Sequence, residues 1–274
     1  MAGEPIASPH VTALSATPVK SLRIGRRESV EADRGGVRGD RAFMLVDERG
    51  RMVNAKHHPA LNQVVAELDG EWLRLRFPDG HVVEGAAAPG EEMRIRFYSM
   101  MRAARAIAGP FSQALSEHVG SPLVLVAFAD GRSAVDRGAA GAVTLVSRAS
   151  VEALAERAGR EHIDSRRFRM TIEIDGVEPF AEDGWIGRKV RVGGATLEPF
   201  GNVGRCTVTT LDPETGEVDL PTLDLLREIR ADAGTSEPLA IGVHCAVVFP
   251  GRVSIGDAVE LDAGVDSADL AGSR

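Results

Sequence analysis

Turn-forming residues divide the first half of the chain into short segments with the character of β-strands. These segments are 11–16, 43–46, 62–68, 72–77 and 93–98, and the breaks include Asp69-Gly70 and Pro78-Asp79-Gly80. Glycine supplies a positive φ and proline fixes its own φ, so such pairs favour turns. The segment 72–77 alternates apolar and charged residues, as a strand with one solvent-facing side does. With one short helix expected at 110–119 after Gly109-Pro110, these segments favour a barrel-like β architecture.

The second half continues this pattern after a polar, glycine-rich stretch at 130–141, which we expect to be a linker. Ser147 can cap the helix that follows it, and Gly159 can end that helix. Another short helix is expected after Thr222. Strands are expected at 142–146, 170–174, 190–192, 207–210, 246–249 and 258–261. The predicted fold class is mainly β with a few helices, as a domain at 1–129, a domain at 130–262 and a disordered tail at 263–274.

Composition restricts the possible partners. A net charge of -8 argues against a nucleic-acid-binding surface, so any anion site must be a local cluster of basic residues. No apolar run approaches the roughly 20 residues that span a bilayer, and the first residues lack the features of a secretory signal. The two cysteines are too few for a disulfide framework and suit a reducing compartment. We therefore expect a cytoplasmic protein with no nucleic-acid and no membrane partner.

Cys206 is the most informative single residue. It follows Arg205 and precedes the β-branched run 207–210 and the turn signature Asp212-Pro213-Glu214-Thr215-Gly216, so we expect it at the start of a hairpin strand. Thiolates bind soft or redox-active metals, and a neighbouring guanidinium favours the thiolate over the thiol. The alternative is a small buried core cysteine. We interpret Cys245, in the apolar run 242–248, as a core residue of that kind.

Several segments resemble the MOSC superfamily, which is named after the C-terminal domain of molybdenum cofactor sulfurase. In chain order they are Pro18-Val19-Lys20-Ser21, Gly39-Asp40-Arg41, Arg167-Phe168-Arg169, Glu178-Pro179-Phe180, Gly204-Arg205-Cys206 and Gly242-Val243-His244. The resemblance covers about residues 10 to 262 and is greatest for two-domain members such as the mitochondrial amidoxime reducing components. It implies an N-terminal β-barrel domain at 1–129 and a MOSC β-barrel domain at 130–262, which meet around a molybdenum cofactor.

The resemblance also implies roles for individual residues. Cys206 would be the protein ligand of molybdenum, with Arg205 beside it in the catalytic site. The phosphate of the pterin cofactor needs strong hydrogen-bond donors. Candidates for these donors are Lys20, Ser21, Arg41, Ser147 and Arg169. Next to the last of these, Met170 and Thr171 replace the proline and asparagine that relatives have.

Three further residues have two interpretations each. Glu182 and Asp183 could shape the substrate side of the site or form a turn cluster. His244 replaces a tyrosine common in relatives; it could line the site and titrate near neutral pH, but a buried core histidine is the commoner case.

The expected function is that of a molybdenum-cofactor oxidoreductase that reduces N-hydroxylated small molecules. The chain lacks a dinucleotide-binding Gly-x-Gly-x-x-Gly motif and the cysteines of an iron–sulfur cluster. We therefore expect a separate electron donor, such as a ferredoxin, flavoprotein or cytochrome. Two alternatives remain open: a sulfur carrier that holds a persulfide on Cys206, and a cofactor carrier or storage protein without turnover.

Overall fold

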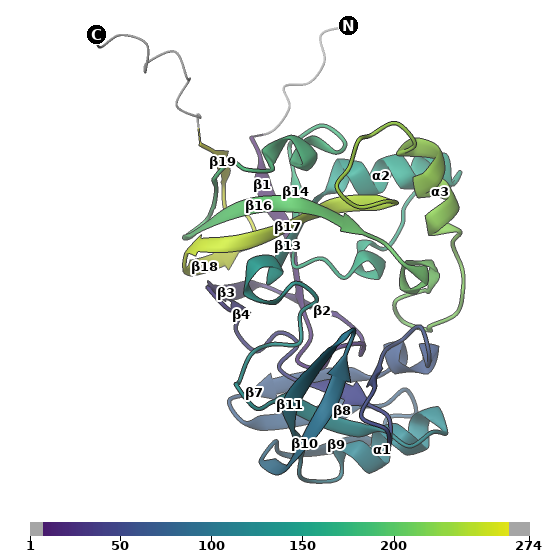
Figure 1. Ribbon diagram of the computed structural model, residues 1–274. Helices are drawn as coiled ribbons and strands as arrows, with labels where there is room; N and C mark the ends of the chain where they lie inside the picture. Colours follow the sequence, from purple (N-terminus) through teal and green to yellow (C-terminus); the bar gives the residue numbers. More distant parts are fainter. Residues whose placement is uncertain (1–7, 263–274) are drawn as a thin grey trace, which may run out of the picture.

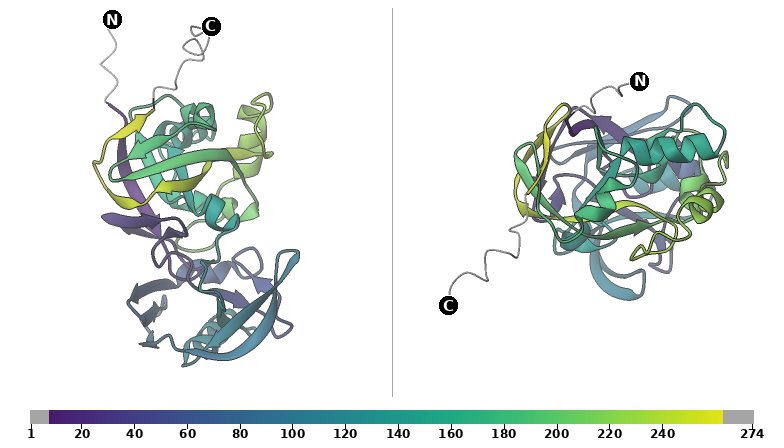
Figure 2. Two further views of the ribbon diagram at one scale, coloured as in Figure 1. Left: turned by 60° about the vertical axis from the view of Figure 1, so that its left-hand side comes forward. Right: turned by 90° about the horizontal axis from the view of Figure 1, so that it is seen from above.

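The computed structural model describes residues 8–262. The expected disordered tail at 263–274 lies outside the described residues. Within 8–262 the chain forms nineteen strands and three α-helices, so the prediction of a mainly β fold with few helices is confirmed. Figures 1 and 2 show two lobes, with the middle of the first half of the chain in one and the second half in the other. No helix in the described part is long and apolar enough to cross a bilayer.

The smaller lobe contains two sheets with an apolar core between them, and the five-stranded sheet buries a second apolar cluster on its other face. The five-stranded sheet has the order β10-β11-β12-β5-β6, and the three-stranded sheet has the order β7-β8-β9. The strands are β5 (Met44–Val46), β6 (Met52–Val53), β7 (Val65–Asp69), β8 (Trp72–Arg76), β9 (Val82–Ala86), β10 (Pro89–Phe97), β11 (Met100–Ile107) and β12 (Val124–Phe128). Helix α1 (Phe111–Val119) begins after Pro110, as expected, and buries Phe111 and Leu115 in that core.

The larger lobe is built on an eight-stranded sheet of order β19-β15-β16-β17-β13-β14-β1-β2, beside a small sheet β18-β3-β4. These strands are β1 (His10–Ala16), β2 (Gly25–Arg27), β3 (Ser29–Asp33), β4 (Gly36–Val37), β13 (Val143–Ser147), β14 (Ile172–Asp175), β15 (Val190–Val192), β16 (Ala195–Gly204), β17 (Ala240–Phe249), β18 (Gly251–Ser254) and β19 (Val259–Leu261). Helices α2 (Arg148–Arg157) and α3 (Thr222–Ile229) lie together at one end of it (Figure 1).

The large sheet is barrel-like without a continuous closing ladder in the described residues. An isolated bridge between His10 and Ala258 brings β1 next to the segment before β19. Two backbone bonds support this approach, from Val11 N to Asp257 O at 2.9 Å and from Gly256 N to Val11 O at 2.8 Å. The sheet therefore curves around its buried apolar face, in which Val11 and Leu14 pack with residues of the second half of the chain.

The first strands belong in space to the larger lobe. Strand β1 pairs antiparallel with β14, with Leu14 opposite Ile172, and β3 pairs with β18. The chain then crosses to the smaller lobe and returns through 130–141. The boundary between residues 129 and 130 stays a prediction about the sequence domains. It does not separate the two lobes in space, because the first strands complete the sheet of the second domain.

The prediction of a strand at 207–210 is wrong. Thr207–Thr210 form a 3-10 turn, η5, after an extended Cys206. Threonine hydroxyls stabilise the turn by donating to carbonyls three residues earlier: Thr209 Oγ1 bonds Cys206 O at 2.9 Å, and Thr210 Oγ1 bonds Thr207 O at 2.7 Å. This local bonding competes with a strand ladder and outweighs the β propensity of the run.

Candidate functional site

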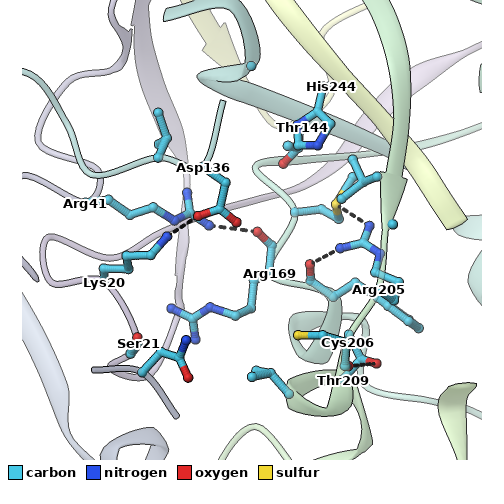
Figure 3. Close-up of a pocket in the computed structure, with 18 of the residues that line it drawn as sticks. Lys20, Ser21, Arg41, Asp136, Thr144, Arg169, Arg205, Cys206, Thr209 and His244 are labelled. Carbon is cyan, nitrogen blue, oxygen red and sulfur yellow. Dashed lines mark hydrogen bonds and ion pairs between the residues drawn. The ribbon is translucent and has the colours of Figure 1, made fainter. Parts of the chain in front are cut away.

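A cavity of about 180 Å³ lies where the two lobes meet. Loops and strand ends from both halves of the chain line it. Its polar lining includes Lys20, Ser21, Arg41, Asn54, Tyr98, Asp136, Thr144, Arg167, Arg169, Arg205, Cys206, Thr209 and His244 (Figure 3). The structure thus brings together six of the seven predicted site residues, from four separate parts of the sequence.

Backbone conformation fixes the basic residues at the cavity. Ser21, Arg41 and Arg169 all have positive φ, at 80°, 49° and 53°. Such angles are uncommon for residues with a Cβ and cluster at functional sites. Two backbone hydrogen bonds hold the loops that carry Ser21 and Arg41: Lys20 N donates to Phe43 O at 2.8 Å, and Arg41 N donates to Thr17 O at 2.7 Å. The loops that carry Lys20 and Arg41 are therefore tied to each other.

Two carboxylates partly balance the positive charge. Asp136 is ion-paired with Lys20, and the buried Asp40 is ion-paired with Arg41. Arg41 also donates from Nη2 to the backbone carbonyl of Arg169 at 2.9 Å. The guanidinium of Arg169 points toward the side of the cavity that holds Lys20 and Ser21 (Figure 3).

The cations at the cavity are buried and close to one another. Burial lowers the pKa of Lys20; the charge of Asp136 opposes that shift, and Arg41 and Arg169 add to it. Burial and repulsion from Arg41 lower the pKa of Arg169 to about 10. Nη2 of Arg169 is buried without a hydrogen-bond partner in the described protein. A buried, unpaired donor is costly unless a ligand satisfies it, so this arrangement favours an anion.

Arg205 has a role that the sequence did not predict. Its guanidinium donates to the carbonyls of Phe168 (2.8 Å) and Ile241 and to the sulfur of Met170. It thereby joins the ends of β16 and β17 to the segment before β14. Burial lowers its pKa to about 9, which leaves it charged at neutral pH. Arg205 therefore positions the loop of Cys206, in addition to placing a positive charge near the thiol.

Cys206 is exposed and lines the cavity, whereas Cys245 is fully buried. Cys245 packs in the core of the large sheet, and burial raises the pKa of its thiol. The interpretation of Cys245 as a core residue is confirmed. The second turn after Cys206, which contains Glu214 and Thr215, contacts the other lobe. Arg23 Nη2 donates to Glu214 O at 2.7 Å, and Gln63 Nε2 donates to Thr215 O at 2.9 Å.

Ser147 does not line the cavity. It is fully buried and caps α2 by accepting a hydrogen bond from Ser150 N at 3.1 Å, as expected for a helix N-cap. Glu182 joins the same buried network by accepting from Ser150 Oγ at 3.0 Å. Asp183 is ion-paired with Arg230. The turn-cluster interpretation of Glu182 and Asp183 is therefore the one that the structure favours.

Asp136 and Tyr98 are site residues that the sequence analysis missed. Tyr98 donates its hydroxyl proton to Asp136 at 2.7 Å, and both line the cavity. Burial would raise the pKa of Asp136, but the charge and hydrogen bond of Lys20 and the bond from Tyr98 outweigh it and lower that pKa to about 2. One available signal was that Tyr98 is the single tyrosine of the chain.

His244 lies in the cavity wall near Thr144, well away from Cys206 (Figure 3). Its ring stacks on Phe200 with centroids 5.9 Å apart. Burial, together with repulsion from Arg205 and Arg137, lowers its pKa to about 4, so the ring is neutral at physiological pH. The histidine is thus both buried and part of the lining, and the expectation that it titrates near neutral pH is not met.

The residues fit a phosphorylated, metal-binding cofactor. The lining contains five cationic side chains and one carboxylate, in a chain of net charge -8. Of the five, Arg167 is ion-paired with Asp219 at 2.9 Å, Lys20 with Asp136 and Arg41 with Asp40. Arg169 has an unpaired buried donor, and an exposed thiol lies in the same cavity. Soft thiolates and clustered guanidinium groups are the donors that such a ligand requires.

Two family models match the chain in this order: the MOSC N-terminal beta barrel domain over residues 8–119 and the MOSC domain over residues 132–260. The fold and the site therefore define a member of the MOSC superfamily in its two-domain form, and the chain belongs to that superfamily.

The chain is also similar in sequence to several curated proteins. Mitochondrial amidoxime-reducing component 1 of Xenopus laevis is 28% identical over 91% of this chain and 81% of its own length. Its namesake in Homo sapiens is 25% identical over 89% and 80%. Molybdenum cofactor sulfurase of Oryza sativa is 23% identical over 76% of this chain, which spans 29% of that protein. The solved structure of YuaD from Bacillus subtilis aligns over 93% of this chain and 96% of its own, with TM-score 0.44 and 13% identity.

Proposed function

We propose that this protein is a molybdenum-cofactor oxidoreductase that reduces N-hydroxylated small molecules with electrons from a separate protein. The observation that carries the proposal is the juxtaposition of an exposed thiol, Cys206, with a buried cationic cluster that contains an unpaired donor. Similarity to the amidoxime-reducing components supports the choice of reaction. A reducing compartment such as the cytoplasm agrees with two free cysteines, although these relatives are named mitochondrial.

Each residue has a defined task in this proposal. Lys20, Ser21, Arg41 and Arg169 would hold the phosphate end of the cofactor, and Cys206 would ligate the metal. Arg205 would keep the Cys206 loop in place through its bonds to Phe168 and Ile241. When bound, the cofactor supplies the redox chemistry that cleaves an N–O bond. Ser147 has no part in binding here, because its hydroxyl is engaged with Ser150 away from the cavity.

The neutral His244 would line the substrate side. Its ring cannot compete with the cationic cluster for an anion, since it carries no charge at neutral pH. A planar, uncharged group of a substrate could instead approach it and Thr144. Water and proton access would be through the mouth of the cavity beside Tyr98, whose side chain is half exposed.

The exposure of Cys206 also favours a second candidate, a sulfur carrier, because a persulfide relay requires an accessible thiol. Similarity to part of molybdenum cofactor sulfurase agrees with it. In that function the thiolate would attack the outer sulfur of a donor persulfide, the donor thiolate would leave, and Cys206 would carry the sulfur. The cationic cluster would then have no ligand, which is why we rank this function second.

The test compares three proteins purified from a cofactor-competent host: wild type, Cys206→Ser and Cys245→Ala. We expect about one molybdenum per wild-type chain, and reduction of benzamidoxime by dithionite-reduced viologen without activity from NADH or NADPH. Cys206→Ser should lose turnover, because serine keeps the size but lacks the soft ligand. Cys245→Ala, which changes only a core residue, should keep it.

Three other outcomes would change this conclusion about the function. Full molybdenum loading with retained turnover in Cys206→Ser would refute the ligand role. A persulfide on Cys206, seen by mass spectrometry in protein free of molybdenum, would support the sulfur carrier. Full loading with no dye-driven turnover would support a carrier or storage protein.

A further inference from the structure

The hairpin of β10 and β11 carries a cluster of arginines on its outward face. In the pairing register Arg94 faces Ala103, Arg96 faces Met101 and Glu92 faces Arg105. Directly opposed residues of antiparallel strands share one face, so these six side chains lie together, and all six are exposed. The other face packs inward through Ile95, Phe97 and Ala104. The outward face therefore has three positive charges and one negative charge.

The arginines are only partly neutralised. Arg105 donates to Glu92 at 3.2 Å, and Arg96 donates from Nε to the carbonyl of Tyr98 at 3.1 Å. Arg94 has no ion pair within residues 8–262. Met101, which is 53% exposed, lies opposite Arg96. The apolar side chains of the face, Ala103 and Met101, are both on β11 and lie opposite Arg94 and Arg96. Arginine and methionine are enriched at protein-binding surfaces.

The turn of this hairpin reaches the cavity. Tyr98 forms the turn of the hairpin, lines the cavity that contains Cys206, and donates its hydroxyl proton to Asp136 at 2.7 Å. In Figure 1 the hairpin projects from the smaller lobe toward the larger one. Nζ of Lys20 lies 5.7 Å from the ring centre of Phe97, which is on the inward face, so the arginines are on the side of the hairpin that faces away from the cavity. A protein bound to the arginine face near the turn would therefore be separated from the site by the thickness of the hairpin.

We propose that the outward face of the β10–β11 hairpin docks a small acidic one-electron carrier of the ferredoxin or flavodoxin type. The inference rests on the proposed function, which requires an external donor. The chain as a whole has a net charge of -8 and would repel an acidic protein. A local net charge of +2 on the outward face of the hairpin would overcome this at short range and orient the carrier.

The stoichiometry of the reaction suits a transient complex. Reduction of an N-hydroxylated compound to its amine or amidine consumes two electrons and two protons and releases one water. A one-electron carrier is oxidised once at each encounter, so two carriers must bind and leave in each turnover. Charge-guided association with fast dissociation permits this, whereas a large apolar interface would retain the spent carrier.

The experiment uses full-length, molybdenum-loaded protein with two probes, a plant-type [2Fe–2S] ferredoxin and a flavodoxin. The test variant is Arg94→Glu/Arg96→Glu, and Arg94→Gln/Arg96→Gln is its neutral counterpart. The matched control is Arg188→Glu/Lys189→Glu, which makes the same change of charge at two exposed residues next to β15 in the larger lobe. Binding is measured from low to high ionic strength by the change in NMR line widths, beside carrier-driven and viologen-driven turnover.

We expect the test variant to associate with at least one carrier about tenfold or more slowly at low ionic strength. The difference should shrink as salt screens the charges. Viologen-driven turnover and molybdenum content should stay at the wild-type level, and the neutral variant should be intermediate. Equal losses in the test and control variants would overturn the assignment of this face. So would a wild-type protein that binds neither carrier. Failure of viologen-driven turnover in loaded wild type would instead refute the proposed function, while the binding comparison would still decide the surface.

Discussion

The ammonium group of Lys20 is ion-paired with the carboxylate of Asp136, a residue of the linker at 130–141 that lies within the matched MOSC domain. Tyr98 donates to the same carboxylate, so Asp136 connects the loop after β1, the β10–β11 turn and the linker. Nζ of Lys20 also lies 5.7 Å from the ring centre of Phe97 and 5.9 Å from that of Tyr98. One linker residue therefore holds the cationic wall of the cavity in place.

Asp136→Ala should loosen the linker. The substitution leaves Lys20 without its counter-charge and Tyr98 without its acceptor, so residues 130–141 lose two of their contacts with the rest of the cavity wall. We expect faster hydrogen exchange and faster tryptic cleavage in that segment of the cofactor-free protein. Asp130→Ala is the control, because it removes an exposed ion pair and a local backbone hydrogen bond, both with Arg132, and exposed pairs contribute little. Equal protection in the two variants would contradict the role of Asp136.

The fold could be predicted from the sequence where local pattern and packing agree. Strands such as β1 and β8 and helix α1 appear close to their expected positions. The ten-residue strand β16 was not expected, because its segment contains Pro199, Gly201 and Asn202. The pairing of β16 with β17 is irregular at these positions, between Pro199 and Gly201 and between Asn202 and Gly204. Only long-range pairing with β17 makes this segment a strand, and local propensity does not contain that information.

Only some of the site residues could be predicted from the sequence. Basic residues in family-like motifs, such as Lys20 and Arg169, indicated the cationic wall. Asp136 lies in a polar linker and Tyr98 in a turn, and neither segment has a pattern that indicates a ligand-binding role. Their contribution depends on the packing of the two lobes. Ser147 shows the opposite case: its local role as a helix cap was predictable, but its distance from the cavity was not.

Arg41→Lys should weaken cofactor binding without unfolding the protein. Lysine keeps the charge but loses the planar pair of donors, so we expect a loss of about 1.5–3 kcal/mol in binding, which is about ten- to a hundredfold in affinity. Molybdenum and pterin content after purification, beside the melting temperature of the cofactor-free protein, would show this. Normal occupancy would mean that Arg41 does not contact the ligand.

Arg41→Ala should behave differently from Arg41→Lys. It removes the ionic partner of Asp40, whose side chain is 1% exposed and retains a hydrogen bond from Thr17 N at 2.8 Å. Breaking a buried pair costs about 3–5 kcal/mol, so the cofactor-free protein should lose stability as well as occupancy. Asp40→Asn/Arg41→Ala removes both charges and should recover part of that stability in chemical denaturation. No recovery would indicate that the backbone of Arg41, and not its charge, holds the loop.

Gly216→Ala should destabilise the contact between the lobes. Gly216 has a φ of 76°, and an added Cβ would lie 2.3 Å from the carbonyl oxygen of Pro59. The positive φ alone costs about 1–2 kcal/mol for alanine, and the clash adds to it. Gly80→Ala is the matched control, with a φ of 86° and open space around the added atom. We expect a clearly lower melting temperature and lower molybdenum occupancy for Gly216→Ala than for Gly80→Ala. Equal effects would mean that the turn after Cys206 can move without harm.

His244 should make the cofactor-free protein less stable in mild acid. Its pKa is lowered from 6.5 to about 4 by burial and by the charges of Arg205 and Arg137, against the attraction of Asp136. Above pH 6.5 the ring is neutral in both the folded and unfolded chain. As pH falls from 6.5 toward 4 the unfolded chain gains a proton that the folded chain does not, so stability is lost, by up to about 3 kcal/mol. The phenylalanine of His244→Phe cannot titrate, so the free energy of unfolding of this variant should not show the loss between pH 6.5 and 4. Chemical denaturation of wild type and variant between pH 7.5 and 4.5 would show curves that diverge below pH 6.5, with His162→Phe, at an exposed histidine, as the control. Parallel curves for wild type and His244→Phe would show that the ring does not remain neutral in the folded protein.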